Sequence, residues 1–521
     1  MKAIFRTDAS AAAGGGHVIR CLALAQALSE IGCLCEFACT EETSAVVPAL
    51  SQSKYKVHHL KNSEYADPGA LSKKLGGTCD WLIIDHYQLG ADYESHCRSF
   101  AKAIATIDDL RRQHDCDILI DQTAGTLRQH YEDLVPAPAR LLTGSHYALL
   151  RPPFWALRET SLLKGQQERI NNVFVSVGTV DQQDLCSKIL DACAMIDSDF
   201  SMDIVIGSTS ANLKKLQTRA RGAHRRIAVH TDLDAHAVAR LIGQSELAIG
   251  SGGTISWERC CLGVPTIMIL SAENQKHVAN HLQELGAVAY LGTSADVTAR
   301  QIADTIIELG QDAEYRRQMS LRAASICDGR GAARVARSLL PLLSKDGSRV
   351  EIRPVSMSDA DLLLIWRSHP LIYKNSRNQS APSESEHREF LERKLSDPYC
   401  HFNIITHNGL PSGVLRLDMI REKERLARTS SASAWRPQYE VSILVDPERQ
   451  KLGIAQCALQ LASELVPHAV LLAYIREGNG ASEKLFSNAG YVHDGKWFVR
   501  PPLSLSNSRE TDSQTILKTF Q

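Results

Sequence analysis

The first thirty residues combine a strand, a glycine-rich loop and a helix, the opening of a βαβ unit. Residues 2–8 read as a short buried strand, and residues 14–17 are Gly-Gly-Gly-His. From Val18 to Ile31 apolar residues recur at helical spacing, until Gly32 ends the helix. Glycines let a backbone approach a ligand closely, and free N–H groups at a helix start favour anions. The stretch therefore predicts an α/β fold with an anion-binding loop.

His17 is the residue of this loop that can do chemistry. It stands at the predicted helix start, where a diphosphate would lie, and an imidazole can move a proton near neutral pH. The loop is neither G-x-G-x-x-G nor a P-loop, so it predicts neither a dinucleotide fingerprint nor a nucleoside triphosphatase. The local sequence leaves open the alternative that His17 is a helix residue with no chemistry.

Length and charge limit the classes of protein. With 521 residues the chain predicts about three domains, and 44% hydrophobic residues suffice for full cores. The net charge of −1 gives no basic excess for nucleic acid or an anionic membrane, so neither is expected as a partner. The 14 cysteines are scattered without a C-x-x-C motif, which favours reduced thiols. With no signal peptide and no membrane-spanning run, we expect a cytoplasmic protein.

Residues 1–150 alternate strands and helices. The predicted strands are 2–7, 35–39, 56–60, 80–85, 103–107 and 117–121. Most are continuous apolar runs, which suit a parallel sheet covered on both faces. Two of them end in polar clusters, Asp85-His86-Tyr87 and Asp108-Asp109, at the edge where ligands bind in such sheets. For Tyr87 function and surface packing are equally open, whereas for Asp108-Asp109 a turn with a helix cap is the favoured interpretation.

A second alternating set follows. Residues 136–153 read as a crossover, and strands are predicted at 173–178, 202–206, 227–229, 247–249 and 266–269. Two βα domains in series predict a bilobal enzyme.

The second lobe carries a sharper motif. The strand 247–249 runs into Gly250, Ser251, Gly252, Gly253 and Thr254 and then into a helix, so a phosphate can sit on backbone amides.

Three polar side chains follow this loop. Glu258, about one turn into the helix, could accept two ribose hydroxyls, although a carboxylate there is also favourable to the helix dipole without any ligand. Asn274 and Gln275 offer donors and acceptors for sugar hydroxyl and acetamido groups, or are simply polar loop residues.

Together these motifs resemble the GT-B sugar-nucleotide enzymes over residues 1–340. Phe5-Arg6-Thr7-Asp8 with Gly16-His17, and Ile84-Asp85-His86-Tyr87, are most similar to the UDP-2,4-diacetamido-2,4,6-trideoxy-β-L-altropyranose hydrolases of pseudaminic acid synthesis. The resemblance implies that the second-lobe loop and Glu258 hold UDP and that His17 serves catalysis. The substrate-binding residues that it implies are Asp8, Gly16, Tyr87, Ser251, Gly252, Gly253, Thr254, Glu258, Asn274 and Gln275. No metal is expected.

A third unit is expected after a polar linker at 344–349. The segment 421–436 is charged and serine-rich and reads as an insertion, and 504–521 reads as a polar tail. Residues 449–455, Arg-Gln-Lys-Leu-Gly-Ile-Ala, and 479–491, from Asn-Gly-Ala-Ser to Gly-Tyr, follow two predicted strands, 440–445 and 470–475.

These two motifs resemble the GNAT acetyltransferases, over about residues 350–500. The resemblance implies acetyl-CoA as cosubstrate, with its pyrophosphate on the backbone amides at 450–455. The implied cofactor-binding residues are Val445, Gln450, Leu452, Gly453, Ile454, Ala455, Asn479 and Ser482. Phe486 stands where many members carry a tyrosine that protonates the leaving thiolate, which a phenyl ring cannot do. Glu440 is the candidate base, with a cross-strand ion pair as an equally open interpretation.

The expected fold is therefore α/β: a GT-B-like pair of Rossmann-type lobes, 1–150 and 151–343, and a C-terminal α+β GNAT domain, 350–503. The leading hypothesis is a bifunctional enzyme of pseudaminic acid synthesis. Its GNAT domain would acetylate a UDP-4-amino sugar, and its GT-B part would cleave UDP from the diacetamido product. The alternative is a UDP-sugar glycosyltransferase whose GNAT domain only binds acetyl-CoA or a partner.

Overall fold

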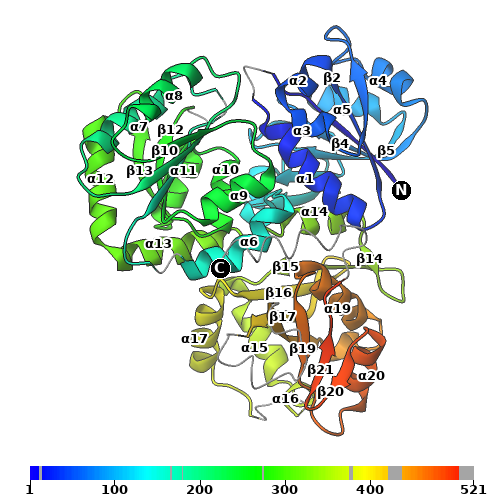
Figure 1. Cartoon of the computed structure of the whole chain (residues 1–521). Helices are drawn as coiled ribbons and strands as arrows, with labels where there is room; N and C mark the ends of the chain where they lie inside the picture. Colours follow the sequence, from blue (N-terminus) through cyan, green and yellow to red (C-terminus); the bar gives the residue numbers. More distant parts are fainter. Residues whose placement is uncertain are drawn as a thin grey trace. The chain divides into compact units, whose positions relative to one another are not determined.

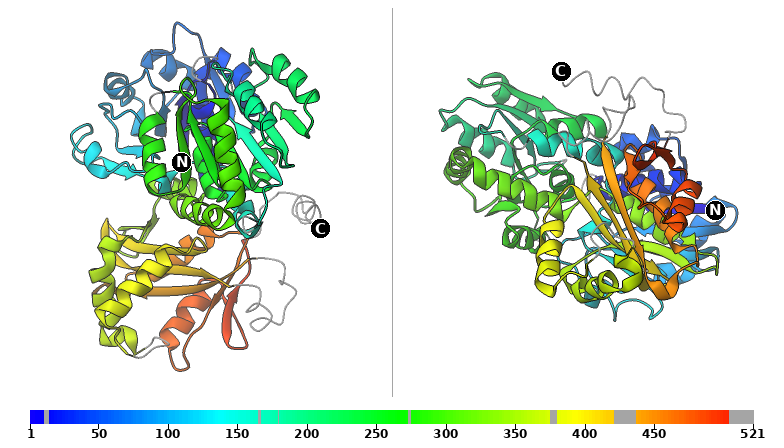
Figure 2. Two further views of the ribbon diagram at one scale, coloured as in Figure 1. Left: turned by 90° about the vertical axis from the view of Figure 1, so that its left-hand side faces the viewer. Right: turned by 90° about the horizontal axis from the view of Figure 1, so that it is seen from below.

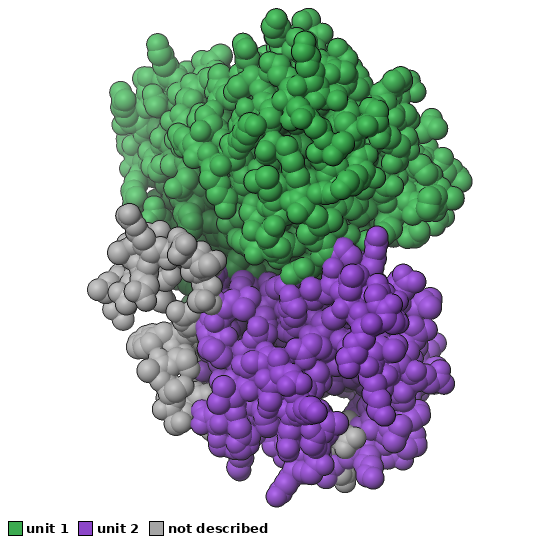
Figure 3. Space-filling view, turned by 90° about the vertical axis from the view of Figure 1, so that its right-hand side faces the viewer, with its two compact units in different colours: residues 1–340 green, residues 341–521 purple. Residues whose placement is uncertain are grey.

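The computed structural model describes residues 1–10, 14–164, 167–178, 180–272, 275–374, 380–420 and 437–503. The chain divides into two compact units, residues 1–340 and 341–521, which Figure 3 distinguishes by colour. The expected insertion 421–436 and the expected tail 504–521 lie outside the described residues.

The first sheet of unit 1 is parallel, in the order β3-β2-β1-β4-β5-β6-β7 (Figure 1). Its strands are β1 (Lys2–Thr7), β2 (Leu34–Thr40), β3 (Lys56–Leu60), β4 (Cys79–Asp85), β5 (Ala101–Ile107), β6 (Ile118–Asp121) and β7 (Arg140–Thr143). The six strands predicted in residues 1–150 are all present. The segment 136–153, expected as a crossover, also contains β7, a short half-buried strand at the edge of the sheet.

Helices cover this sheet on both faces, and the one after β1 is the longest. They are α1 (Gly16–Glu30), α2 (Glu41–Val46), α3 (Pro48–Ser51), α4 (Pro68–Leu75) and α5 (Ala91–Cys97), with 3-10 turns η1 (Arg128–His130) and η2 (Ser145–Tyr147).

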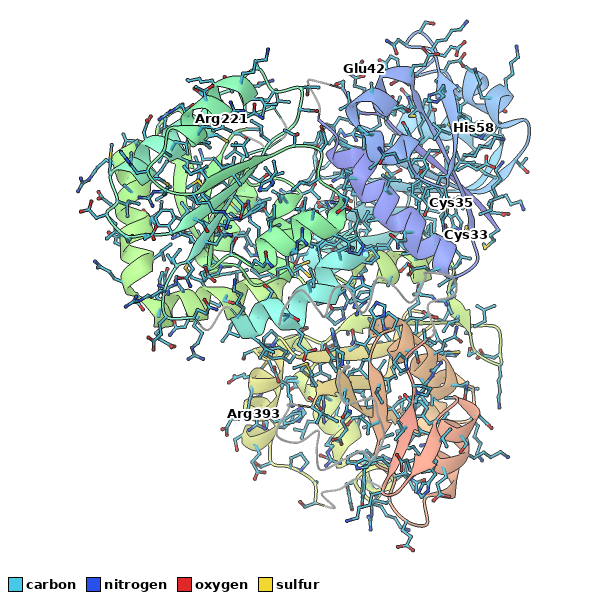
Figure 4. All side chains as sticks on the ribbon, in the orientation of Figure 1. Cys33, Cys35, Glu42, His58, Arg221 and Arg393 are labelled. Atoms are coloured by element: carbon cyan, nitrogen blue, oxygen red, sulfur yellow. The ribbon has the colours of Figure 1, made fainter. Side chains whose placement is uncertain are left out.

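All 14 cysteines are free thiols, buried except Cys400 and Cys457, which are half-buried. The Cys35 thiol donates to the carbonyls of Ala25, at 3.6 Å, and Cys33, at 3.7 Å, so both cysteines lie beside α1 (Figure 4).

The second sheet is also parallel, in the order β10-β9-β8-β11-β12-β13. Its strands are β8 (Asn172–Ser176), β9 (Ser201–Val205), β10 (Ile227–His230), β11 (Leu247–Gly250), β12 (Thr266–Leu270) and β13 (Val288–Thr293). Its helices are α6 (Pro152–Lys164), α7 (Leu185–Ala194), α8 (Leu213–Arg221), α9 (Ala235–Gly243), α10 (Ile255–Cys261), α11 (Lys276–Glu284), α12 (Ala299–Gln311) and α13 (Ala313–Ile326).

The last helix of unit 1, α14 (Gly331–Leu339), returns to the first lobe (Figure 1). Its apolar residues Ala332, Val335, Ala336 and Leu339 join the buried core formed around α1 and β1. The expected second lobe, 151–343, therefore gives its final helix to the core of the first.

Both sheets have the Rossmann strand order, with the reversal between β1 and β4 and between β8 and β11. In open parallel sheets ligands bind beyond the carboxyl ends of the strands, at this reversal point. The expected GT-B-like pair of Rossmann-type lobes is confirmed, and the two glycine loops follow β1 and β11 at their reversal points.

Unit 2 contains a mixed sheet in the order β14-β15-β16-β17-β18-β19-β21-β20, whose long strands lie side by side in Figure 2. The strands are β14 (Leu342–Leu343), β15 (Arg349–Pro354), β16 (Cys400–His407), β17 (Leu410–Met419), β18 (Gln438–Val445), β19 (Val470–Ala473), β20 (Val492–Asp494) and β21 (Trp497–Arg500). The helices are η4 (Met357–Asp359), α15 (Ala360–Ser368), α16 (Pro370–Tyr373), α17 (Glu384–Leu395), η5 (Pro447–Arg449), α19 (Ile454–Leu465) and α20 (Gly480–Asn488).

This sheet and its helices have the expected α+β architecture of a GNAT domain. β14 and β15 pair antiparallel, so the segment 344–349, expected as a linker, lies in a hairpin within unit 2: residues 344–348 form its turn, and Arg349 is the first residue of β15. Asp346 accepts hydrogen bonds from the Ser344 hydroxyl and the Ser348 N–H, which stabilise the turn.

Candidate active sites of the two units

His17 is the second residue of α1 and contacts a carboxylate from the neighbouring strand. Its Nδ1 lies 2.5 Å from Oδ1 of Asp85, the last residue of β4. The parallel register pairs Thr7 with Asp85, so the end of β4 lies beside the loop that leads from β1 to His17. The sequence placed both residues at one edge of the sheet; the structure joins them in a hydrogen bond.

Arg20 binds the same carboxylate. One turn after His17 on α1, it donates to both Asp85 oxygens, from Nε at 2.6 Å and from Nη2 at 2.7 Å. Its Nη1 reaches Asp109 at 3.2 Å. Burial favours the neutral form of Asp85, but Arg20 and His17 outweigh it and hold the pKa of Asp85 well below its usual range. Asp85 is therefore an ionised, immobile acceptor.

This arrangement determines which nitrogen of His17 is available. If Asp85 accepts the proton carried by Nδ1, the lone pair is on Nε2, the nitrogen that can act as a base. The His17 side chain is 11% exposed, so a small reactant can reach it while bulk water is largely excluded. The pattern is that of a base oriented by a carboxylate.

Two predicted binding residues lie near this pair. The Tyr87 ring meets the His17 ring edge-on, with centroids 4.5 Å apart. Burial and the neighbouring Asp109 raise the pKa of Tyr87, so its hydroxyl stays protonated. Asp8 accepts from Nη2 of Arg6 at 2.8 Å and from the Thr40 N–H at 2.7 Å, and lies 3.2 Å from Nε2 of His86. Its role toward a substrate stays a prediction.

The second-lobe loop lies beside the His17 loop within unit 1. A Cβ built on Gly16 would lie 3.6 Å from the Thr254 hydroxyl, so the loops that follow β1 and β11 come together. Ser251 is buried and Gly253 half-buried. The N–H of Gly252 donates to Oε1 of Gln275 at 3.1 Å. Gln275 thus secures the loop, which leaves its amide nitrogen for the predicted sugar contact; Asn274 lies outside the described residues.

Glu258 is a buried carboxylate behind this loop. Its Oε1 lies 3.5 Å from Nη2 of Arg151, and the residue is 6% exposed. Burial raises the pKa of Glu258, although Arg151 opposes the shift. A buried carboxylate with one long ion pair keeps acceptor capacity, which suits ribose hydroxyls. Its contact with a nucleotide stays a prediction.

Sequence reasoning did not assign roles to the residues that orient these groups. The role of Arg20 could have been predicted from its spacing. Residues three apart share a helix face, so an arginine one turn after a functional histidine can contact the same carboxylate. Asp85 was placed at the functional edge but not paired with His17. Arg151 carries no local signal, since its contact with Glu258 spans more than one hundred residues of sequence.

In unit 2 the two predicted central strands separate. β18 and β19 pair in parallel only from Gln438 opposite Val470 to Glu440 opposite Leu472. Residues 441–445 of β18 continue beside β17 alone, which opens the sheet at the carboxyl end of the two strands. The two strands therefore splay apart at this end of the sheet.

Glu440 lies at the point where these strands part. Its register neighbours are Asp418 on β17 and Leu472 on β19, so neither cross-strand neighbour is a cation. Asp418 is itself bound by Arg416, at 2.7 Å, and Lys394, at 2.5 Å. Glu440 is half-buried at the opening, where a base would be needed. Its catalytic role stays a prediction.

The predicted pyrophosphate loop starts α19. Gly453 has φ of +84°, a left-handed conformation that glycine adopts without strain, and precedes Ile454 and Ala455 in the first turn. The Leu452 carbonyl accepts from the Lys345 N–H at 2.8 Å, so the hairpin turn supports this loop. Gln450 is exposed, and Val445 ends β18 opposite Gly413. A helix start presents backbone N–H groups that have no acceptor within the helix, so the start of α19 fits a pyrophosphate.

The second GNAT-like motif forms α20. Asn479 caps this helix by accepting from the Ser482 N–H at 3.2 Å, a structural role for both predicted cofactor residues. Phe486 is 4% exposed and meets Tyr491 edge-on at 4.9 Å. Phe486 is thus a core residue.

Comparisons with known proteins match both parts. Residues 172–334 match the family model of the glycosyltransferase family 28 C-terminal domain, and residues 349–492 match that of the acetyltransferase (GNAT) domain. The chain is 29% identical over 287 residues to a UDP-2,4-diacetamido-2,4,6-trideoxy-β-L-altropyranose hydrolase of Campylobacter jejuni, covering 55% of this chain and 97% of that protein. The first part of the chain is thus homologous to a hydrolase, and the last part is a GNAT domain.

Two further comparisons each cover about two thirds of the chain. The spore coat polysaccharide biosynthesis protein SpsG of Bacillus subtilis is 25% identical over 348 residues, covering 64% of this chain and 96% of that protein. The crystal structure of MurG of Acinetobacter baumannii superposes with a TM-score of 0.49 and 13% identity, covering 65% of this chain and 99% of that one. In the described ranges of the chain no helix has the length and apolar character to span a membrane.

Proposed function

We propose that the chain is a bifunctional enzyme that acts on UDP-amino sugars in pseudaminic acid synthesis. Unit 1 hydrolyses UDP-2,4-diacetamido-2,4,6-trideoxy-β-L-altropyranose to the free sugar and UDP. Unit 2 acetylates the 4-amino group of the precursor UDP-4-amino sugar with acetyl-CoA. The observation that carries the proposal is the hydrogen bond between His17 and Asp85 at the reversal point of a parallel sheet, in a region homologous to a hydrolase of this specificity.

His17 is the general base of the hydrolysis. A water molecule forms a bond to the anomeric carbon and gives its proton to Nε2, while the bond from that carbon to the UDP oxygen breaks and its electrons leave with UDP. Asp85 holds the ring in place and stabilises the imidazolium that forms, as Arg20 holds Asp85. Because UDP leaves as a stable anion, no metal is assigned to this step; its absence stays a prediction.

The second-lobe loop binds the nucleotide in this proposal. Among the described residues the N–H groups of Gly253 and Thr254 have no acceptor, so they can donate to a phosphate. Glu258 then accepts the ribose hydroxyls. The loop lies next to Gly16, which brings the sugar end of a UDP-sugar toward His17.

Unit 2 supplies the second activity. Acetyl-CoA, which the GNAT domain implies, provides the acetyl group as a thioester. The loop 450–455 binds its pyrophosphate, and the opening between β18 and β19 admits the pantetheine arm. Glu440, at that opening, takes the proton that the sugar amine loses as its nitrogen bonds to the acetyl carbon.

The alternative is a glycosyltransferase with a GNAT domain that only binds acetyl-CoA or a partner. One experiment distinguishes the bifunctional enzyme from this alternative. The full chain is incubated with the UDP-4-amino sugar, with or without acetyl-CoA, and the products are identified by NMR. The proposal predicts free diacetamido sugar, UDP and CoA only when acetyl-CoA is present. Release of CoA without free sugar would leave an acetyltransferase alone; no CoA release would make unit 2 a binding module.

A second incubation tests hydrolysis of the UDP-sugar separately from acetylation. The diacetamido UDP-sugar is supplied without acetyl-CoA and without any acceptor. Free sugar in this arm supports the hydrolase, whereas turnover that appears only when an acceptor alcohol is added would establish the glycosyltransferase instead.

A further inference from the structure

Arg259 is a fully buried guanidinium beneath the second-lobe loop. It extends from α10, is 1% exposed, and its Nη2 donates to the Ser251 carbonyl at 2.6 Å and to the Ser256 hydroxyl at 3.1 Å. A Cβ built on Gly250 would lie 2.1 Å from Nη1 and 2.4 Å from the Ser176 carbonyl. The guanidinium therefore occupies the space between the carboxyl ends of β8 and β11, which requires glycine at position 250.

The charge of Arg259 has no carboxylate partner within the described part of the chain. Its Nε and Nη1 are both buried without a hydrogen-bond acceptor. Two other buried arginines of unit 1, Arg20 and Arg334, are paired with Asp85 and Asp328, and buried Arg316 donates to four backbone carbonyls. Burial lowers the pKa of Arg259 to about 10, so it still carries its charge at neutral pH. A buried, unpaired cation is strongly unfavourable unless an anion comes near.

The nearest place for such an anion is the surface of the loop directly above. Two and three residues after Ser251, whose carbonyl Arg259 binds, the N–H groups of Gly253 and Thr254 have no acceptor among the described residues, so the same loop carries free neutral donors and a buried cation behind it. Ligands of parallel sheets bind at this strand-end edge. Electrostatic attraction through a protein interior is screened less than through water, so the charge acts across the loop.

We propose that Arg259 is a positioning residue that makes the loop bind a charged nucleoside diphosphate, such as UDP, more tightly than the uncharged nucleoside uridine. This inference rests on the proposed binding of UDP at the loop. Arg259 does not touch the ligand: it holds the Ser251 carbonyl inward, so that the loop amides face the phosphates, and it supplies the positive charge behind them. The nucleoside part of the ligand is bound by other residues.

The test compares ligands that differ only in charge. Binding of UDP, UMP and uridine is measured by calorimetry for the wild-type chain, Arg259→Met and Arg259→Lys. We expect the preference for UDP over uridine to fall about ten- to a hundredfold in Arg259→Met, the range of charge-assisted interactions, with uridine affinity unchanged. The same variant without ligand should melt no lower than wild type, because an unpaired buried charge is gone, yet gain less from added UDP.

Arg259→Lys keeps the inference falsifiable even if Arg259→Met does not fold. A buried lysine has a lowered pKa, so its charge is lost as pH rises. The UDP-over-uridine preference of Arg259→Lys should therefore decline between about pH 7 and 9, while that of the wild type stays constant. A flat profile for the lysine variant, or an equal loss of UDP and uridine affinity in the methionine variant, would overturn the inference.

The outcomes also separate this inference from the proposed function. If the wild type binds UDP and Arg259→Met binds it with the same preference over uridine, only the role of Arg259 fails. If the wild-type chain binds no UDP, the nucleotide assignment of the loop fails, and the role of Arg259 fails with it.

Discussion

Asp85 lies 2.5 Å from Nδ1 of His17, and the same carboxylate receives two hydrogen bonds from Arg20. The three side chains come from α1 and β4, which are adjacent because β1 and β4 pair in parallel with Thr7 opposite Asp85. A histidine acts as a general base only when its imidazole ring is held in one orientation and in one tautomer. This contact therefore has consequences for rate rather than for binding.

Replacing Asp85 by asparagine should lower kcat for hydrolysis by up to about 10⁴-fold, because an amide can hold the ring in the wrong tautomer. The KM for the UDP-sugar should change little, since Asp85 is hydrogen-bonded to His17 and Arg20 rather than to groups of the nucleotide loop. Asp80→Asn, on the same strand but in a surface pair with Lys102, is the control and should keep wild-type rates. Steady-state kinetics with equal kcat for both variants would remove Asp85 from the mechanism.

Glu258→Gln should weaken UDP binding and raise KM by about ten- to a hundredfold, the cost of hydrogen bonds to a charged acceptor, while kcat falls less. The exposed Glu284→Gln on α11, whose side chain is 77% exposed, controls for the loss of a negative charge. Calorimetry with UDP gives the readout. Unchanged UDP affinity in Glu258→Gln would show that the carboxylate serves only its ion pair with Arg151.

A buried histidine between two carboxylates, His114, predicts a pH-dependent stability. His114 lies 2.8 Å from Glu94 and 3.5 Å from Asp108. Burial opposes its charge, but these carboxylates raise the pKa of His114 to about 9, from the usual 6.5. Because the folded pKa is the higher one, this stabilisation is complete below about pH 6.5 and is lost as pH rises through about 9.

The lost stabilisation is up to about 3 kcal/mol, at about 1.4 kcal/mol for each pKa unit. Chemical unfolding of wild type and His114→Gln should therefore show a gap in the free energy of unfolding that is large at pH 6 and shrinks toward pH 10. His96→Gln, at an exposed position on α5, should show no such gap. A gap that does not depend on pH would mean that His114 is neutral in the folded chain.

Glu440→Gln should lower kcat for CoA release by about 10²–10⁴-fold, the usual effect of losing a general base, and leave hydrolysis by unit 1 unchanged. The loss should be smaller at high pH, where more of the sugar amine is already neutral. Glu384→Gln, on α17 with a 68% exposed side chain, is the matched control. Thiol release with the UDP-4-amino sugar measures the rate; equal rates for the two variants would reject Glu440 as the base.

The fold was readable from the sequence where strands are buried on both faces. Residues 2–7 form a strand with the predicted limits, and the predicted strand 80–85 differs from β4 by one residue, because buried runs in parallel sheets have a distinct pattern. β7 was missed because Arg140–Thr143 is a half-buried edge strand with little apolar contrast. The return of α14 to the first lobe was also not predicted, since an amphipathic pattern does not say which core it covers.

The sequence predicted the loops of the candidate site but not the residues that hold those loops and His17 in place. Glycines and a histidine after a strand are visible in one sequence, whereas the bond from Asp85 to His17 depends on which strands become neighbours. Arg259 illustrates the limit: an arginine inside a helix ordinarily reads as a solvent-exposed residue, yet here the chain buries it under Ser251. Only tertiary structure shows that Gly250 makes the space for it.

The central claim is that His17 directs a water molecule to the anomeric carbon. Hydrolysis of the diacetamido UDP-sugar in H₂¹⁸O, with the products analysed by mass spectrometry, tests it most directly. We predict the label in the sugar hydroxyl and none in UDP, at a rate reduced by about 10²–10⁴-fold in a folded His17→Ala variant. Label in the UDP phosphate, or a His17→Ala variant as fast as wild type, would contradict it.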